Sequence, residues 1–195
     1  VAASDGLFRL DRGVLKEARS GQKRIQQWSN IIAANIFKVL RLLQRAADED
    51  SHRYAETIST LQEISESLRD VVMRGYLHAA NNHSGLLDSQ VAEMSRVRSC
   101  LVEILDRTST ALLERKAPNM KVIQARSREL RMLVHEFDEN QILRIQDNTS
   151  KTRLSILFYA IIGNARMLSK QNVKLLEIFA ESFGGIEAVD PFDLD

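Results

Sequence analysis

The stretch from Ser150 to Phe183 carries the densest apolar run of the chain, between Ile156 and Ile162. After that run, apolar residues keep recurring at spacings near 3.6 residues for several turns, which is typical of a helix. Around the run the apolar positions spread beyond one stripe, so neighbouring elements must wrap most of the helix. A buried Leu, Ile or Phe contributes roughly 1.5–3 kcal/mol, whereas a domain's net stability is only about 5–15 kcal/mol. The rest of the chain must therefore cover this helix.

Residues that interrupt helices are scarce. The sequence holds 8 Gly and 2 Pro in 195 residues, and strand-like alternation is rare, so the chain is predicted to be all-α. Segments of similar length predict an antiparallel up-down bundle of about five long helices. The last of them is expected to end at Gly184-Gly185. We expect one bundle domain over residues 1–187 and an acidic, flexible tail over residues 188–195.

The first helix is expected over residues 10–47, after a frayed start at residues 1–5. Along it, apolar residues alternate at spacings of three and four and form a seam of the kind that helices use to pack together. Asn35 occupies one seam position, as Asn172 does in the last helix. Each of the two would either fix the helix register or touch water at the rim of the bundle. The seam includes Ile25, Trp28 and Ile32.

Turn chemistry sets the other boundaries. The acidic cluster at residues 48–50 suits a turn and the start of a second helix, which is expected to end near Ala80. Residues 81–85 predict a turn, because Asn and Gly tolerate positive φ. Pro118 marks the end of the third helix. Residues 147–150 prefer caps to helix interiors, so they are expected to separate the fourth helix from the fifth.

The charge and cysteine content exclude some classes of protein. The net charge is +1, and acidic and basic residues are taken as interleaved, which gives no support to nucleic-acid binding. The single cysteine, Cys100, excludes an intrachain disulfide and fits a reducing compartment. No uninterrupted apolar segment approaches the ~18 residues that span a bilayer. Because the first residue is Val and no signal-peptide pattern follows, we expect a piece of a longer protein.

Two passages resemble a known family. They are HRYAETISTLQEISESLRDVV followed by NNHSGL, and later NQILRIQDNTSKTRLSILFYAIIGNARML. Both are similar to the C-terminal cytoplasmic domain of Pit-type inorganic phosphate transporters of the Bacteroides type, a domain related to the helical-bundle regulator PhoU. The resemblance covers roughly residues 25–183. It rests on the leucine-rich helix before the turn, on the TR-S-L pattern at residues 152–157, and on the turn motif Asn81, Asn82, His83 and Gly85.

The resemblance implies a PhoU-like fold and a non-catalytic regulatory domain that modulates phosphate uptake. Its implied place is the cytoplasmic side of the inner membrane, as the soluble domain of an integral membrane protein. Its implied partner is the membrane domain of its own transporter, with a homodimer as a further expectation and no cofactor. PhoU proteins bind metal through an E/D-x-x-x-D motif in each half. Glu66 and Asp70 fit that spacing, but Asn164 stands where the second motif needs an acid, so no metal site is expected.

Other classes stay open from the residues alone. A stand-alone helical scaffold or signalling-adaptor bundle is the alternative, and a metal-binding bundle enzyme is a third reading. Di-iron bundles need the Glu-x-x-His element twice, and Glu49-x-x-His52 is a single copy that fits a helix start better. The sequence offers no catalytic constellation, so we do not expect an enzyme.

Three other histidines are candidates for binding or structural roles. His83 would either bind an anion or serve as a polar turn residue, and the second role is favoured. His78 and His135 are expected to be hydrogen-bonded histidines at the edge of the core.

Overall fold

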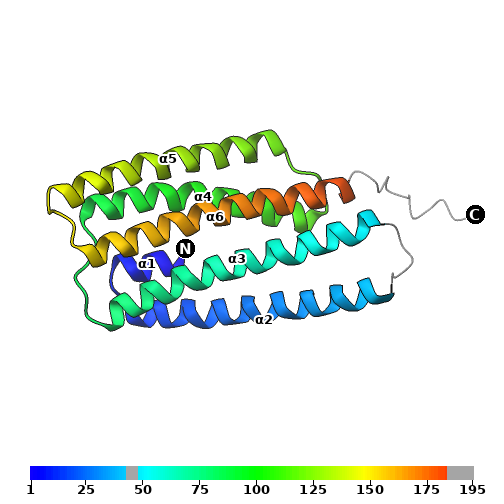
Figure 1. The fold of residues 1–195 in the computed structure, drawn as a ribbon, viewed down its shortest axis with the longest axis horizontal. Coiled ribbons are helices and arrows are strands. Elements are labelled where there is room, and N and C mark those ends of the chain that lie inside the picture. The colour runs from blue at the N-terminus through cyan, green and yellow to red at the C-terminus, as the bar shows by residue number, and fades with distance from the viewer. Residues whose placement is uncertain (43–47, 184–195) are drawn as a thin grey trace, which may run out of the picture.

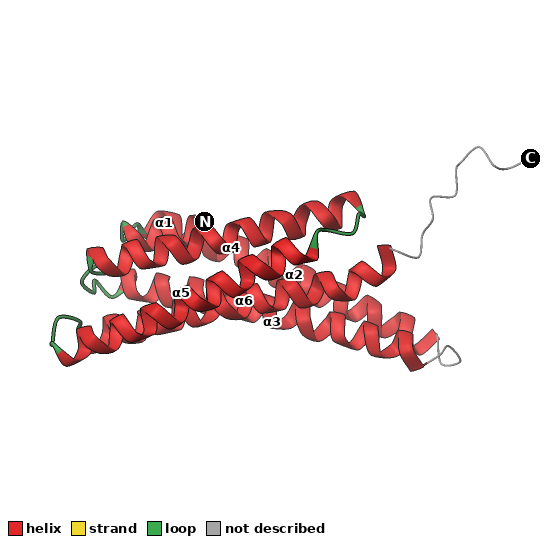
Figure 2. Ribbon diagram, turned by 90° about the horizontal axis from the view of Figure 1, so that it is seen from above, coloured by secondary structure: helices red, strands yellow, loops and turns green. Residues whose placement is uncertain are grey.

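The structure, a computed structural model, describes the backbone of residues 1–42 and 48–183 and the side chains of residues 1–38 and 52–180. Throughout the described backbone the regular elements are helices and no strand occurs, which confirms the expected all-α bundle (Figure 2). The expected end of the last helix at Gly184-Gly185 and the expected tail over residues 188–195 lie outside the described residues. The helices are α1 (Ala2–Phe8), α2 (Arg12–Leu42), α3 (Asp48–Ala80), α4 (Asp88–Glu114), α5 (Met120–Gln146) and α6 (Thr152–Phe183).

The last helix, α6, is the one that the others cover. It packs against α3 on one side and against α4 and α5 on the other, whereas α2 lies at an edge of the bundle (Figure 1). Phe158 is fully buried, Leu157 is buried and Ile161 is half-buried, so the expected covering of the apolar run is confirmed. The main core lies between α4, α5 and α6, and its largest fully buried side chains are Ile104, Ile123, Leu130, Phe137, Phe158, Ile162 and Leu176.

The predicted first helix is confirmed as α2 from Arg12 to Leu42, and residues 43–47 lie outside the described part, but the start of the chain is not frayed. α1 forms a separate short helix because Leu7 is buried against Leu15 of α2. Arg98 of α4 also donates a hydrogen bond to the Asp5 carboxylate at 2.6 Å. The chain turns between α1 and α2 at Leu10, whose φ is 52°. The Asp11 carboxylate then accepts the Val14 N–H at 3.0 Å near the start of α2.

The other described boundaries lie where the turn chemistry predicts them. α3 ends at Ala80. α4 ends at Glu114, and its C-cap Arg115 is left-handed with φ 52°, before Pro118. The turn between α5 and α6 is confirmed, with Asn148 at φ 55°. The acidic cluster at residues 48–50 forms the first turn of α3, and the residues just before it lie outside the described part.

The apolar seam predicted along the first helix faces away from the bundle. Trp28 is 65% exposed, and Ile25 and Ile32 are exposed as well. The seam prediction is wrong because α2 turns other residues toward α3. Near its start Leu15 packs in one cluster with Ala79, and further along Gln26 accepts a 2.9 Å hydrogen bond from Ser65. The inward residues of α2 include Leu15, Gln22, Ser29 and Ala33.

The two seam asparagines differ. Asn35 is exposed at the rim of the bundle. Asn172 is buried in α6, where its Nδ2 donates to the Leu168 carbonyl at 2.8 Å. Neither makes a side-chain contact to another helix among the described hydrogen bonds, so register is set elsewhere.

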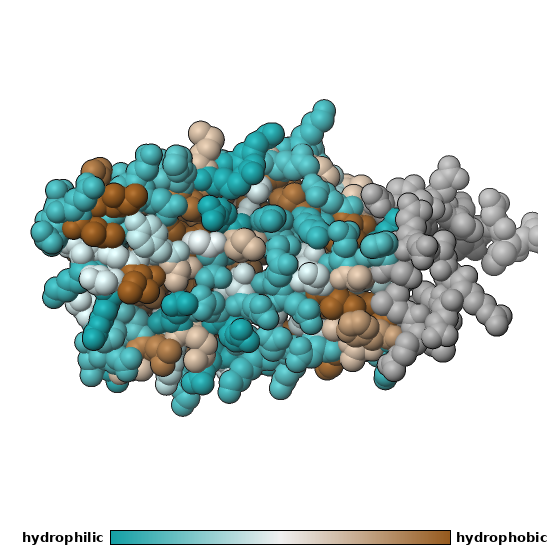
Figure 3. Space-filling model, in the orientation of Figure 1, coloured by the Kyte–Doolittle hydropathy of each residue, from teal (hydrophilic) through white to brown (hydrophobic). Residues whose placement is uncertain are grey.

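The face of the bundle seen in Figure 1 is mostly hydrophilic, with apolar side chains in small separate groups (Figure 3). Among the described helices, none combines enough length with enough apolar character to cross a bilayer.

Candidate functional site

The two segments that carry the family resemblance meet at one end of the bundle. The turn after α3 and the start of α6 line one open cleft, although they are separated by 70 residues in the sequence at the contact between His83 and Arg153. The cleft is formed by His78, Asn82, His83 and Ser84 from the first segment and by Lys151, Thr152, Arg153 and Leu154 from the second. The fold therefore assembles these residues into a single candidate site.

The turn is held in place by the start of α2. Asn82 adopts φ 54°, a conformation that Asn tolerates better than most residues. Arg12, at the start of α2, donates through Nε to the Ala79 carbonyl at 3.0 Å and through Nη2 to the Asn82 side-chain oxygen. The start of α2 thus fixes the end of α3 and the mouth of the cleft. Gly85 is exposed and has an ordinary negative φ, and a Cβ there would meet only Leu10 at 3.8 Å.

The two histidines of this end have different environments. His78 is buried, and its Nε2 donates to the Ser84 carbonyl at 2.9 Å, which confirms the expected hydrogen-bonded histidine at the core's edge. His83 is half-buried, its ring lies 5.2 Å from that of His78, and its Nδ1 accepts a hydrogen bond from Arg153 at 3.4 Å. Burial lowers the pKa of His78, and the neighbouring His83 adds to this effect.

The side chains that line the cleft favour an anion. Lys151 and Arg153 are both exposed cations, and no acidic residue is among the lining residues. His83 uses Nδ1 as an acceptor, which leaves its Nε2 protonated and able to donate. Cations and N–H donors that converge on one cleft provide the interactions that an oxyanion such as phosphate requires.

We expect His78 to make the protein less stable as the pH falls below about 6.5. Its pKa is 6.5 in an unfolded chain and lower in the fold, so the unfolded chain takes up more protons in that interval. The stabilisation that the neutral His78 side chain contributes is complete above about pH 6.5. It is lost as the pH falls toward the lower pKa that His78 has in the fold. Urea denaturation at about pH 7.5 and about pH 5.5 measures it. His78→Gln should reduce this pH dependence.

His135→Gln is the matched control for this measurement. His135 is exposed on α5 and lies 3.7 Å from Glu139, so the expectation of a core-edge histidine is wrong for this residue. Its helical position falls outside the buried face of α5. The control should keep the pH dependence of the parent protein, and an equal change in both variants would rule out His78 as its source.

The acidic candidates do not form a metal site in the described part of the chain. Asp70 accepts hydrogen bonds from Arg74 at 2.7 Å and from Asn164 at 2.9 Å, and Glu66 is exposed. The fold thus joins Asp70 to Asn164, the residue that stands where the second motif needs an acid, as a carboxylate and an amide. His52 is exposed, whereas the side chain of Glu49 lies outside the described residues.

No group of three His, Cys, Asp or Glu side chains within the described ranges is placed to hold a metal ion. Cys100 has a structural environment: it is buried, and its thiol donates to the Arg126 carbonyl at 3.3 Å. Burial raises the pKa of this thiol, which disfavours the reactive thiolate.

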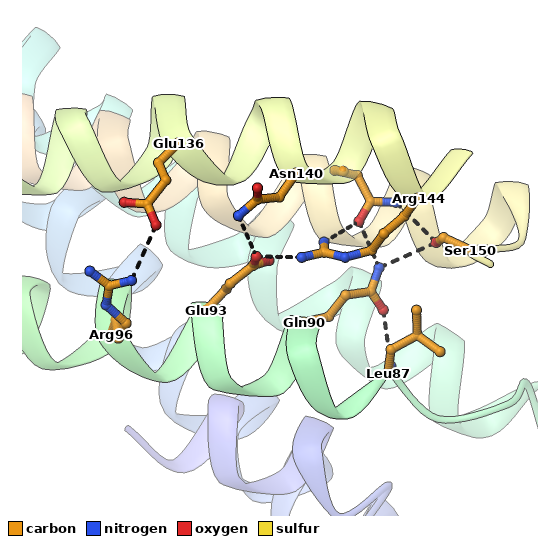
Figure 4. A network of polar contacts seen from close by, with 9 residues as sticks. Leu87, Gln90, Glu93, Arg96, Glu136, Asn140, Arg144 and Ser150 are labelled. Atoms are coloured by element: carbon orange, nitrogen blue, oxygen red, sulfur yellow. Dashed lines mark hydrogen bonds and ion pairs between the residues drawn. The ribbon is translucent and has the colours of Figure 1, made fainter. Parts of the chain in front are cut away.

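A buried polar network connects α4, α5 and the start of α6 near this end (Figure 4). None of the sequence patterns described above predicts it. Gln141 is its centre: its Nε2 donates to Ser150 and to Ser155, each at 2.9 Å. Its Oε1 accepts from Gln90 at 2.9 Å and from Arg144 at 2.8 Å. Because Ser150 and Ser155 flank the first residues of α6, this network fixes the position of Lys151 and Arg153 as well.

An ion pair extends the network along α4 and α5. The Arg144 guanidinium contacts the Glu93 carboxylate, and the two side chains are only 12% and 11% exposed. Asn140 donates to the same Glu93 oxygen at 2.9 Å, and the Arg144 guanidinium lies 5.6 Å from the centre of the Phe158 ring. One signal in the sequence could have identified part of the network. Gln90 stands three residues after Leu87, the position from which a Gln side chain accepts a hydrogen bond from the N–H of the residue before the helix.

The sequence matches no protein-family model, and no curated protein matches it either.

Proposed function

We propose that this chain is a non-catalytic, PhoU-like regulatory domain of a Pit-type inorganic phosphate transporter. The proposal includes the up-down antiparallel arrangement of the long helices and a place on the cytoplasmic side of the inner membrane. The domain would modulate phosphate uptake through contact with the membrane domain of its own transporter, and a homodimer would be compatible with this role.

The observation that carries the proposal is the convergence of the two family-like segments on a cationic cleft. The turn at residues 81–85 and the segment at residues 152–157 each resemble the transporter family, and in the fold they are in contact through His83 and Arg153. A cleft that favours oxyanions is what a domain responding to phosphate would need. The mechanism would be a shift between two packings of the helices, biased by an anion that binds one packing better than the other.

The test uses the full-length transporter with Lys151→Gln and Arg153→Gln together. We expect uptake of radioactive phosphate to persist, while its dependence on internal phosphate becomes at least about tenfold weaker, because each lost charge removes an ionic contact of roughly 1–3 kcal/mol. Deletion of the whole domain should have the same effect. Lys116→Gln with Lys121→Gln, two exposed charges near the start of α5, is the control and should leave regulation intact. Unchanged uptake and regulation after both the cleft substitutions and the deletion would overturn the proposal.

The alternative, a stand-alone scaffold or adaptor bundle, is favoured by one observation. α2 presents apolar side chains to solvent, as a surface for a protein partner would. Long apolar segments in the same reading frame as this chain would favour the transporter instead.

A further inference from the structure

α2 exposes apolar side chains and buries polar ones, which is unusual for a helix that packs only within its own bundle. Its large apolar residues Ile25, Trp28, Ile31 and Ile32 are between 39% and 65% exposed, while its inward side is partly polar. The Ser29 hydroxyl on that inward side is buried without a hydrogen-bond partner. A helix that departs from the usual inside-outside pattern often does so for a function. We call the row Ile25, Trp28, Ile31 and Ile32 the apolar row of α2.

Charge is segregated onto the same helix. α2 contains seven basic residues and a single acidic one, Glu17, whereas the whole chain has a net charge of only +1. The remainder of the chain therefore carries more acidic than basic residues, and the view that charges are interleaved throughout is wrong for α2. The excess of basic residues becomes apparent only once the bounds of α2 are known, because these residues are spread over the whole helix.

Basic residues border the apolar row on its solvent side. Arg24, Ile31 and Lys38 are spaced seven residues apart and so share one face of the helix. Arg24 also lies one turn before Trp28. Both basic side chains are exposed, and α2 lies at the edge of the bundle with nothing of the described chain outside it (Figure 1). With 31 residues, the helix offers a straight surface about 46 Å long.

We propose that α2 docks the protein, lying flat, on a membrane surface that contains anionic phospholipids. An exposed apolar row with a tryptophan, flanked by lysine and arginine, is the combination that binds the boundary between headgroups and acyl chains. Trp28 would sit at headgroup level, where an indole ring can bury its apolar body and keep its N–H hydrated. The basic residues would pair with lipid phosphates.

Charge decides between a lipid surface and a second copy of this chain. In a symmetric dimer through the apolar row, the exposed Arg24 and Lys38 of each copy would lie at the contact, and like charges oppose such a contact. An anionic bilayer neutralises the same charges. The proposal does not rest on the transporter assignment, because the surface needed is the lipid itself.

The experiment mixes the full 195-residue chain with vesicles of phosphatidylcholine alone or of phosphatidylcholine with phosphatidylglycerol, and measures co-sedimentation. We expect binding to the anionic vesicles only, and weaker binding as salt is added. Trp28 is the only tryptophan, so its fluorescence reports on the docking surface directly. Its emission should move to shorter wavelength when anionic vesicles are added.

Paired variants locate the surface. Trp28→Ser should weaken binding about tenfold, and Arg24→Gln with Lys38→Gln about 25-fold, since each basic residue near an anionic surface contributes about fivefold. The controls are Leu113→Ser, which changes an 81% exposed residue of α4, and Arg128→Gln with Arg131→Gln in α5. These should bind as the parent protein does, and circular dichroism should show the same helix content in all variants.

Three results would overturn the proposal. The first is no binding to anionic vesicles at low salt, and the second is equal loss of binding in the control variants. The third is a shift of Trp28 emission that depends on protein concentration in the absence of lipid, which would show that a second copy covers the apolar row. None of these outcomes bears on the uptake test of Lys151 and Arg153, so either proposal can fail without the other.

Discussion

Phe158→Ala should lower the free energy of unfolding by about 3–5 kcal/mol, as expected for the truncation of a fully buried phenylalanine. Phe158 is fully buried in the core shared by α4, α5 and α6, and its ring contacts Tyr159 edge-on and lies beneath the Arg144 guanidinium. Truncation removes both ring contacts and leaves a cavity that the long neighbouring helices cannot close. Urea denaturation followed by circular dichroism measures the loss.

Ile156→Ala is the matched control, since it lies two residues earlier on the same helix. Ile156 is 56% exposed although it belongs to the same apolar run. We expect a loss below about 1 kcal/mol, because this side chain is already partly hydrated in the fold. Similar losses for the two variants would mean that α6 is not covered in the way described.

Arg144→Met should cost about 3–5 kcal/mol, because it leaves the buried Glu93 carboxylate without its cation. The two side chains are almost fully enclosed, and the second carboxylate oxygen of Glu93 is buried with no hydrogen-bond partner. The double variant Glu93→Met with Arg144→Met removes both charges. It should recover most of the lost stability, since apolar residues of similar volume can replace a buried ion pair at little cost.

An exposed ion pair on the same two helices provides the comparison. Arg96 and Glu136 lie 3.4 Å apart with both side chains more than half exposed. Glu136→Gln should cost less than about 1 kcal/mol in the same denaturation experiment. If the double variant of the buried pair were no more stable than Arg144→Met alone, packing around residue 144, and not the unpaired charge, would account for the loss.

Local patterns were sufficient to predict the long helices and most of their ends. The apolar period of α6 and the cap-forming residues at 147–150 are properties of neighbouring residues, and the structure confirms both. The turn at residues 81–85 is local as well, since Asn82 needs only its own tolerance of positive φ. These features do not depend on which helix packs against which.

The rest depends on contacts between distant residues. The seam of α2 has a regular spacing, but spacing alone does not say whether a row faces the core or the solvent, and here it faces solvent. α1 is stabilised because Leu7 packs against Leu15, and no pattern of neighbouring residues predicts that contact. The cleft could not be predicted from either of its segments, because His83 and Arg153 become neighbours only through the packing of α3 against α6.

The length and position of α6 have a mechanical consequence. Its first turn borders the cleft, and its 32 residues form a rod of about 48 Å that runs between three other helices. A hydrogen-bonded rod of this kind bends little, so a displacement of Thr152 cannot be absorbed within one turn. We expect it to move the helix along its neighbours, so that the far end near Phe183 shifts as well. A displacement at the cleft would therefore shift residues at the other end of the molecule without the unfolding of any helix.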